Sequence, residues 1–284
     1  MEARSMTGRA FVGTSGWRYA SWRGDFYPKG LVQRRELSYL AQEVNTVELN
    51  GSFYSLQSPA SYRRWHDETP DDFVFGVKGG RYLTHMLRLH DTGQALANFF
   101  ASGVLVLGDK LGPVLWQLPE SLEFDASALE SFCSSLPTSM RQAAALATSH
   151  DAKVKHPEVP PVTHERPLLH ALEPRHPSFQ DARAVEILRR HNLALVLADS
   201  AERFPVFDEP TADFVYARLH GPERLYAGGY DRRALARWAG RIQRQRSAAG
   251  ATRDAYVYFD NDADGRAPHD AVAMARLLAD PHRS

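Results

Sequence analysis

The chain has 284 residues, of which 43% are hydrophobic and 24% charged, a globular composition with ample apolar material for a large core. The 34 basic and 34 acidic residues give a formal net charge of zero, so bulk charge does not support non-specific binding to nucleic acid or membranes. Length alone allows two domains, but barrels of about 250 residues fold as one.

Three absences narrow the class of protein. The single cysteine, Cys133, excludes an internal disulfide, and its apolar helical neighbours indicate a packed core thiol. Residues 1–10 lack the apolar core of about 7–15 residues that a signal peptide needs. No apolar run reaches about 18 residues, the length of a membrane span. We therefore expect a cytoplasmic protein.

The N-terminal part begins with a predicted strand at 11–16, followed by a long aromatic loop at 17–27. Apolar residues then recur at helical spacing over 37–44. The second strand, 46–50, alternates apolar and polar residues, which is typical of a strand with two different faces.

Ser58-Pro59 then predicts an N-cap with proline at the first helical position. A third strand at 73–78 is followed by a helix from about Gln94. A fourth strand at 113–118 precedes helical patterns over 125–149.

Residues 150–167 are polar and rich in proline, which indicates a surface excursion because strand signals resume directly after it. The fifth strand, 168–175, is followed by a helix from Ala182. The sixth strand is 193–199. Its connection, 200–212, has no helical period, so the sixth helix is expected to be short or missing.

The last two units repeat the pattern. Strand 214–220 is followed by a helix that Asp231 caps, and strand 255–260 by a helix that Pro268 opens. Eight strands alternating with helices favour a single (β/α)8 TIM barrel over residues 1–284, with its core at about 11–280. No Gly-x-Gly-x-x-Gly follows the first strand, which counts against a dinucleotide-binding fold.

The parity of the strands predicts where a site lies. If the apolar side chains of each strand pack on the helices, the opposite positions point into the barrel at the carboxyl ends of the strands, which is the catalytic rim of this fold. Those positions hold Glu48, Asn50, Lys78, Gln117, Glu173, Arg175, Arg218 and His220. Asp199 and Asp260 also end strands, with less clear parity. The alternative interpretation is a set of internal salt bridges, although charges gathered at one rim favour a ligand.

At these residues the chain resembles the DUF72 (YecE-like) family over about 11–280. The resemblance rests on the segments 13–17, 26–28, 47–50 with 53–54, 75–78 with 84–85, 111–113 with 117–119, 173 with 175–176, 218–221 and 258–262. It implies a TIM barrel and little about activity, because the family is one of uncharacterised function. Pro174 departs from the family pattern, which puts the hydrogen bonding of the fifth strand in question.

The first functional hypothesis is an enzyme that acts on an anionic or sugar-like small molecule at the rim, by hydrolase, lyase or isomerase chemistry. Lys78, Arg175 and Arg218 would bind a phosphate or carboxylate. The expected catalytic residues are Glu48, Glu173, Lys78 and His220. The expected ligand-binding residues are Ser15, Trp17, Asn50, Tyr54, Arg81, His85, Gln117, Arg175, His176, Asp199, Arg218 and Asn261.

Two alternatives stay open. No cofactor is expected, but His85, His176 and His220 could meet Glu48, Glu173 and Asp199 as ligands of a divalent metal, as in a metal-dependent phosphodiesterase or endonuclease acting on nucleic acid. The aromatic loop would then stack on bases, whereas otherwise it would cap the barrel as a hydrophobic plug. The other alternative is a non-catalytic binding protein.

Overall fold

A computed structural model of the chain describes residues 8–250 and 252–279. These residues fall into two compact units, which we call the first and the second unit. The first unit comprises Met1–Val47 and Ala194–Ser284, and the second unit comprises Glu48–Leu193. The prediction of a single domain is not tested by this division and stays a prediction.

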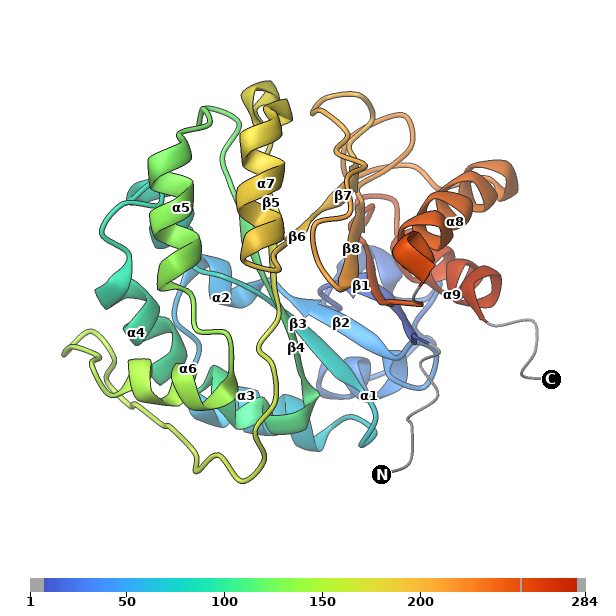
Figure 1. Cartoon of the computed structure of the whole chain (residues 1–284). Helices are drawn as coiled ribbons and strands as arrows, with labels where there is room; N and C mark the ends of the chain where they lie inside the picture. The colour runs from blue at the N-terminus through green and yellow to red at the C-terminus, as the bar shows by residue number, and fades with distance from the viewer. Residues whose placement is uncertain (1–7, 251, 280–284) are drawn as a thin grey trace. The chain divides into compact units, whose positions relative to one another are not determined.

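In the first unit the strands pair in parallel in the order β1-β9-β8-β7. Its strands are β1 (Ala10–Ser15), β6 (Ala194–Leu195), β7 (Leu197–Asp199), β8 (Phe214–Leu219) and β9 (Asp254–Phe259). Its helices are η1 (Ala20–Trp22), η2 (Gln33–Arg35), α1 (Glu36–Leu40), α8 (Arg232–Arg246), η6 (Ala248–Gly250) and α9 (Ala267–Leu278). Helices α8 and α9 lie side by side (Figure 1).

In the second unit β4 lies between β3 and β5, again in parallel. The strands are β3 (Val74–Lys78), β4 (Leu111–Gln117) and β5 (His170–Glu173), and the end of β2 (Thr46–Leu49) also belongs to this unit. The helices are α2 (Gly51–Tyr54), α3 (Pro59–Asp67), η3 (Tyr82–Met86), α4 (Gly93–Ala101), η4 (Val104–Lys110), α5 (Ala126–Ser135), α6 (Met140–Ala147), η5 (Pro177–Gln180) and α7 (Ala182–Arg190). Figure 1 shows α5 beside α7.

Local chemistry fixes most helix starts where the sequence predicts them. The Ser58 hydroxyl accepts a hydrogen bond from the Ser61 amide, with Pro59 at the first helical position. Asp231 accepts from the Ala234 amide at the start of α8. Each such cap satisfies an amide that the helix itself cannot bond, at a gain of about 1 kcal/mol.

Three elements differ in detail from the predicted ones. The helix predicted over 37–44 is only five residues long, as α1. The fifth strand ends at Glu173, directly before Pro174, which has no amide hydrogen for the ladder. The sixth strand is interrupted at Val196. Residues 200–212 contain no helix, as expected, and 150–167 are an excursion without helix or strand.

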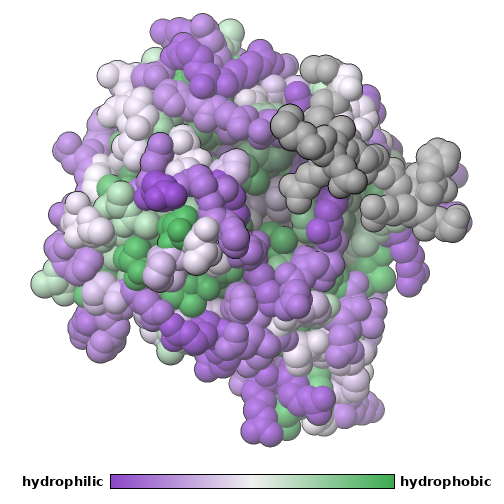
Figure 2. Space-filling view, turned by 60° about the horizontal axis from the view of Figure 1, so that its bottom comes forward, coloured by the Kyte–Doolittle hydropathy of each residue, from purple (hydrophilic) through white to green (hydrophobic). Residues whose placement is uncertain are grey.

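Buried aromatic side chains form much of the core of each unit. In the second unit Trp116 is fully buried and packs on Phe99 of α4 and Phe132 of α5. Gly79 makes this packing possible, since a Cβ atom there would lie 2.2 Å from the Trp116 ring. The face shown in Figure 2 is hydrophilic over most of its area, with smaller apolar patches between the hydrophilic residues.

In the first unit the aromatic loop is part of the core. Trp22 and Tyr27 are fully buried, and Trp17 is 8% exposed. The Tyr27 hydroxyl donates to the Trp17 carbonyl at 2.8 Å. These contacts match the hydrophobic plug better than a platform for stacking bases, because buried ring faces are already covered by protein.

Cys133 is buried, as predicted, and burial raises the pKa of its thiol to about 12. Among the helices that the structure describes, none is both long and apolar enough to cross a membrane.

Candidate functional site

The strand register of the second unit places polar residues on one face of the sheet. Gln117 on β4 pairs with Glu173 on β5, and Lys78 on β3 pairs with Leu115, two residues before Gln117. Residues in register on parallel strands point to the same side, so Lys78, Gln117 and Glu173 share one face. The other face carries Trp116, which packs on helices. In this unit Lys78, Gln117 and Glu173 therefore lie on the face opposite to Trp116.

Four basic side chains, which we call the cationic cluster, gather at this edge: Lys78, Arg81, His85 and Arg175. The pKa of the His85 imidazole reflects how close the other three side chains lie. Its pKa is lowered to about 4 by desolvation, and then by the positive charges of Lys78, Arg81 and Arg175. His85 is therefore neutral at pH 7.

Phe53 holds two members of the cationic cluster in place. The Lys78 Nζ lies 4.3 Å from the centre of the Phe53 ring, a cation–π contact. The His85 ring meets Phe53 edge-on, with ring centres 5.2 Å apart. His85 reaches this position from η3, a single turn of π-helix, and its Nδ1 lies 2.9 Å from the Thr84 hydroxyl. A π-turn of this kind is often found at functional sites. Phe53 is absent from the residues predicted from the sequence, because an apolar ring carries no chemical signal of its own.

Arg175 and Glu173 form the ion pair of this site. The Arg175 Nε and Nη2 atoms donate to Glu173 Oε1 at 3.1 and 3.0 Å. The Glu173 side chain is 2% exposed and that of Arg175 is 12% exposed. The ion pair is therefore largely shielded from solvent. Glu48, on β2, is fully buried.

Polar side chains of the first unit form a different arrangement, which we call the Asp260 network: Ser15, Arg218, His220 and Asp260. The Arg218 Nη2 donates to Ser15 Oγ and to Asp260 Oδ2, each at 3.1 Å. The His220 Nδ1 lies 3.0 Å from Asp260 Oδ2, and its Nε2 lies 3.4 Å from Arg218 Nη1.

The hydrogen-bonding partners assign the roles of the two ring nitrogens of His220. A guanidinium can only donate, so His220 Nε2 accepts from Arg218 and Nδ1 carries the proton that it donates to Asp260. Ser15, Arg218 and His220 are at most 1% exposed. Both ring nitrogens of His220 are thus engaged within the fold.

Asp262 adjoins the Asp260 network; it belongs to the segment 258–262 that carries the family resemblance, but it is not among the predicted site residues. Burial raises its pKa well above the usual 3.8, and the negative charge of Asp260 raises it further. The sequence signal that could have found this pair is the Asp-Asn-Asp run at the end of β9, where two carboxyls follow a buried strand.

Several of the predicted ligand-binding residues have structural partners. Asp199 lies on the other face of its strand and accepts from the Tyr230 hydroxyl at 3.0 Å. The Asn261 Nδ2 donates to the Gly228 carbonyl and to Asp270. His176 caps η5 by accepting from the Ser178 amide.

Three further predicted residues are not members of the cationic cluster as defined, although the Tyr54 ring contacts Phe53, with ring centres 5.1 Å apart. Tyr54 is 72% exposed. Trp17 belongs to the buried aromatic loop. Gln117 is 6% exposed and donates to the Leu118 carbonyl at 3.3 Å.

The predicted metal ligands do not assemble into a metal site. Within 8–250 and 252–279, no group of three or more His, Cys, Asp or Glu side chains has the arrangement that holds a metal ion. In addition, the Nδ1 atom of His176 is hydrogen-bonded to Ser178, and that of His220 is hydrogen-bonded to Asp260.

Comparison with known proteins places the chain in a family. Residues 11–284 match the family described as "Protein of unknown function DUF72". The chain is 26% identical over 149 residues to the UPF0759 protein YecE of Escherichia coli K12. This aligned region covers 52% of this chain and 49% of YecE. It is 28% identical over 117 residues to the UPF0759 protein YunF of Bacillus subtilis 168, which covers 38% of this chain and 39% of YunF. The aligned regions span about half or less of these relatives.

Two solved structures support the fold. A DUF72 family protein from Thermotoga maritima superposes with a TM-score of 0.75 at 26% identity, over 95% of this chain and 99% of that one. A DUF72 family protein from Enterococcus faecalis V583 gives a TM-score of 0.70 at 15% identity, over 95% of each chain. The prediction of a TIM-barrel-like α/β fold is confirmed. The chain belongs to the DUF72 family.

Proposed function

We propose that the cationic cluster binds the phosphate or carboxylate group of a small molecule and that Glu173 serves as the acid or base of a reaction on that molecule. The observation that carries this proposal is that Lys78 and His85 both contact Phe53, while the charges of Arg81 and Arg175 also act on the His85 imidazole. An anion bound there would meet charged donors from two strand ends and one turn.

Arg81 supports the proposal most directly. It is exposed, and no carboxylate among the residues that the structure describes forms an ion pair with it. A flexible guanidinium at the edge of the site is free to close on an anion. Neutral His85 adds a hydrogen-bond donor whose proton a phosphate oxygen can accept.

Glu173 is well placed for proton transfer, because its carboxylate lies at the end of β5 and is oriented by Arg175. Glu48 has the same strand-end position on β2. The geometry favours no choice among hydrolase, lyase and isomerase chemistry. We leave His220 out of the proposed catalytic set, because both of its ring nitrogens are engaged in the Asp260 network.

Isothermal titration calorimetry with inorganic phosphate tests the proposal. We expect the wild-type chain to bind phosphate and Lys78→Met to bind it at least about tenfold more weakly, a change of about 1.4 kcal/mol. Lys155→Met is the matched control, since Lys155 is an exposed lysine of the same unit outside the cluster. Unchanged affinity in Lys78→Met would refute the assignment.

The nucleic-acid hypothesis receives no specific observation in its favour. The aromatic loop that would stack on bases is buried, and the predicted metal ligands have other partners.

A further inference from the structure

The second unit holds a cavity beside the cationic cluster. It has a volume of about 400 Å³ and is lined by three segments, 52–56, 80–91 and 94–99, together with Lys153. Cavities of about 300–1,000 Å³ are the usual size of small-molecule sites. All of these segments belong to one unit, so the cavity is a property of that unit.

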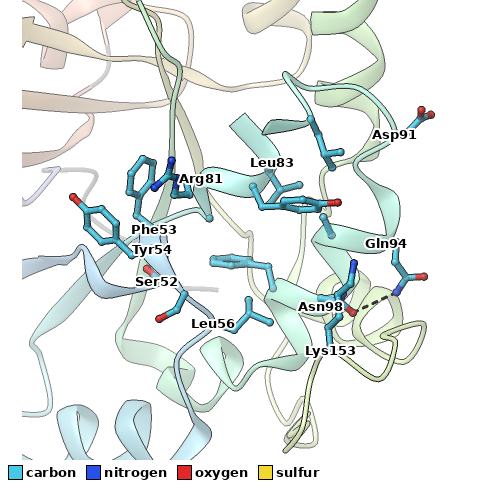
Figure 3. Close-up of a pocket in the computed structure, with 16 residues that line it drawn as sticks. Ser52, Phe53, Tyr54, Leu56, Arg81, Leu83, Asp91, Gln94, Asn98 and Lys153 are labelled. Atoms are coloured by element: carbon cyan, nitrogen blue, oxygen red, sulfur yellow. Dashed lines mark hydrogen bonds between the residues drawn. The ribbon is translucent and has the colours of Figure 1, made fainter. Parts of the chain in front are cut away.

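The cavity meets the cationic cluster at two residues. Phe53 lines the cavity and also contacts Lys78 and His85. Arg81 lines the cavity and contributes to the positive field on His85. Figure 3 shows both residues at the same end of the cavity. An anion on the cluster would therefore have its remaining atoms directed toward the cavity.

The lining of the cavity is mainly apolar and aromatic. Phe53, Tyr82 and Phe99 supply rings, and Leu56 and Leu83 supply aliphatic surface. Leu56 is 42% exposed and Tyr82 is 49% exposed, so part of this apolar lining is accessible from solvent. Rings on several sides suit a flat aromatic group, which gains from stacked and edge-on contacts as well as from burial.

Two uncharged polar side chains at the far end, Gln94 and Asn98, are already hydrogen-bonded within the protein. The Gln94 Nε2 donates to Asn98 Oδ1 at 3.3 Å, the contact drawn in Figure 3, and to the Ser149 carbonyl at 2.9 Å. Asn98 in turn donates to Asp151.

Two charged side chains, Asp91 and Lys153, also line the cavity, and the Lys153 Nζ lies 5.5 Å from the centre of the Tyr82 ring. The cationic cluster adjoins the Arg81 end, and most of the remaining lining offers apolar contact.

We propose that the cavity binds the aromatic body of an aryl phosphate or aryl carboxylate whose anionic group occupies the cationic cluster. This inference rests on the proposed function and names the class of ligand that the site takes. The cationic cluster would bind the charged group. The cavity would add apolar contact, so that an aryl anion binds more tightly than a free inorganic anion.

Calorimetry with three probes tests it: 1-naphthyl phosphate, inorganic phosphate and uncharged 1-naphthol. We expect wild type to bind 1-naphthyl phosphate at least about tenfold more tightly than inorganic phosphate, and 1-naphthol more weakly than the phosphate ester. Ala95→Trp, which fills the cavity from α4, should abolish the preference for the ester and leave the affinity for inorganic phosphate unchanged. Ala236→Trp, on an exposed position of α8, is the matched control and should behave as wild type.

The outcomes separate the two proposals. Equal affinity for inorganic phosphate and the ester would overturn the cavity assignment alone. A preference that survives in Ala95→Trp would do the same. Binding of 1-naphthol as tight as that of the ester, with no binding of inorganic phosphate, would overturn the proposed anion site and leave the apolar cavity as the binding element. No binding of any probe would overturn both.

Discussion

The cationic cluster and the Asp260 network use the same residue types at the same kind of position, yet they are built differently. Each contains an arginine that lies at or just beyond the end of a parallel strand, and a histidine, which follows β8 in the network and comes from η3 in the cluster. In the network, the arginine and histidine are buried and bonded to one carboxylate of their own unit. In the cluster, cations crowd a neutral histidine beside an open cavity, and Arg81 faces solvent.

This difference shows that strand-end charge alone does not identify a binding site. A buried arginine with protein acceptors on its donors is a structural element, because a ligand would have to displace those acceptors. An exposed cation beside a cavity, such as Arg81, leaves room for an acceptor that comes from outside. The predictions below test this contrast.

The largest effect is expected for Arg218→Met. It removes a buried guanidinium from the partly buried Asp260 carboxylate and from the Ser15 hydroxyl, which costs about 3 kcal/mol of the free energy of unfolding. Arg81→Met, in the cationic cluster, should stay within about 0.5 kcal/mol of wild type, because Arg81 is exposed. Urea denaturation measures both. If the two variants were equally stable, the contrast between the network and the cluster would fail.

The second prediction concerns the two carboxyls of the β9 end. The pKa of Asp262 is higher in the folded chain than its usual value of 3.8 in the unfolded chain. As the pH rises above 3.8, the unfolded chain therefore releases this proton before the folded chain does. The free energy of unfolding falls over this pH range, until the pH reaches the raised pKa of the folded chain. The free energy of unfolding of Asp262→Asn should therefore exceed that of wild type by about 1 kcal/mol at pH 7, and the two should be equal below pH 3.8.

Asp260→Asn is the matched comparison and should destabilise at pH 7, because Arg218 and His220 lose a charged acceptor. Thermal unfolding of both variants at several pH values measures the difference. A stabilised Asp260→Asn would mean that the network is under charge repulsion and open to a ligand.

The third prediction concerns Glu173→Gln. Removing this negative charge beside the cationic cluster should tighten phosphate binding by about 1 kcal/mol, or fivefold, since the carboxylate repels the anion. The same variant should lose any turnover of an aryl phosphate, because an amide cannot transfer a proton. Glu123→Gln, an exposed glutamate of the same unit, is the control. Weaker phosphate binding in Glu173→Gln would show that Glu173 orients the cations more than it repels the anion.

The smallest effect is a titration shift at His85. Its pKa is about 4 in the folded chain against the usual 6.5, so protonation costs stability as pH falls from 6.5 through 4. A bound phosphate neutralises the neighbouring cations and should raise this pKa by about one unit. Histidine ring signals followed by NMR measure it, with His85→Gln for assignment. His170 is an internal control, because burial alone lowers its pKa to about 4 and phosphate should leave it unchanged.

The sequence by itself determined the alternation of strands and helices, the Ser58 and Asp231 caps, and the face of the sheet on which Lys78 and Glu173 lie. These features depend on local propensity and on a side-chain period of two, which can be read from neighbouring residues. The same local reasoning explains why β5 ends before Pro174.

Only the tertiary structure decided which strand-end charges are satisfied by the protein and which adjoin a cavity. Asp260 meets Arg218 across 42 residues of chain, and Phe53 meets His85 across 32, so no local pattern records either contact. The π-turn at Tyr82–Met86 and the burial of Trp22 likewise depend on distant packing. The partner of a charged side chain is set by which segments the fold brings together, and that choice separates a structural network from a candidate site.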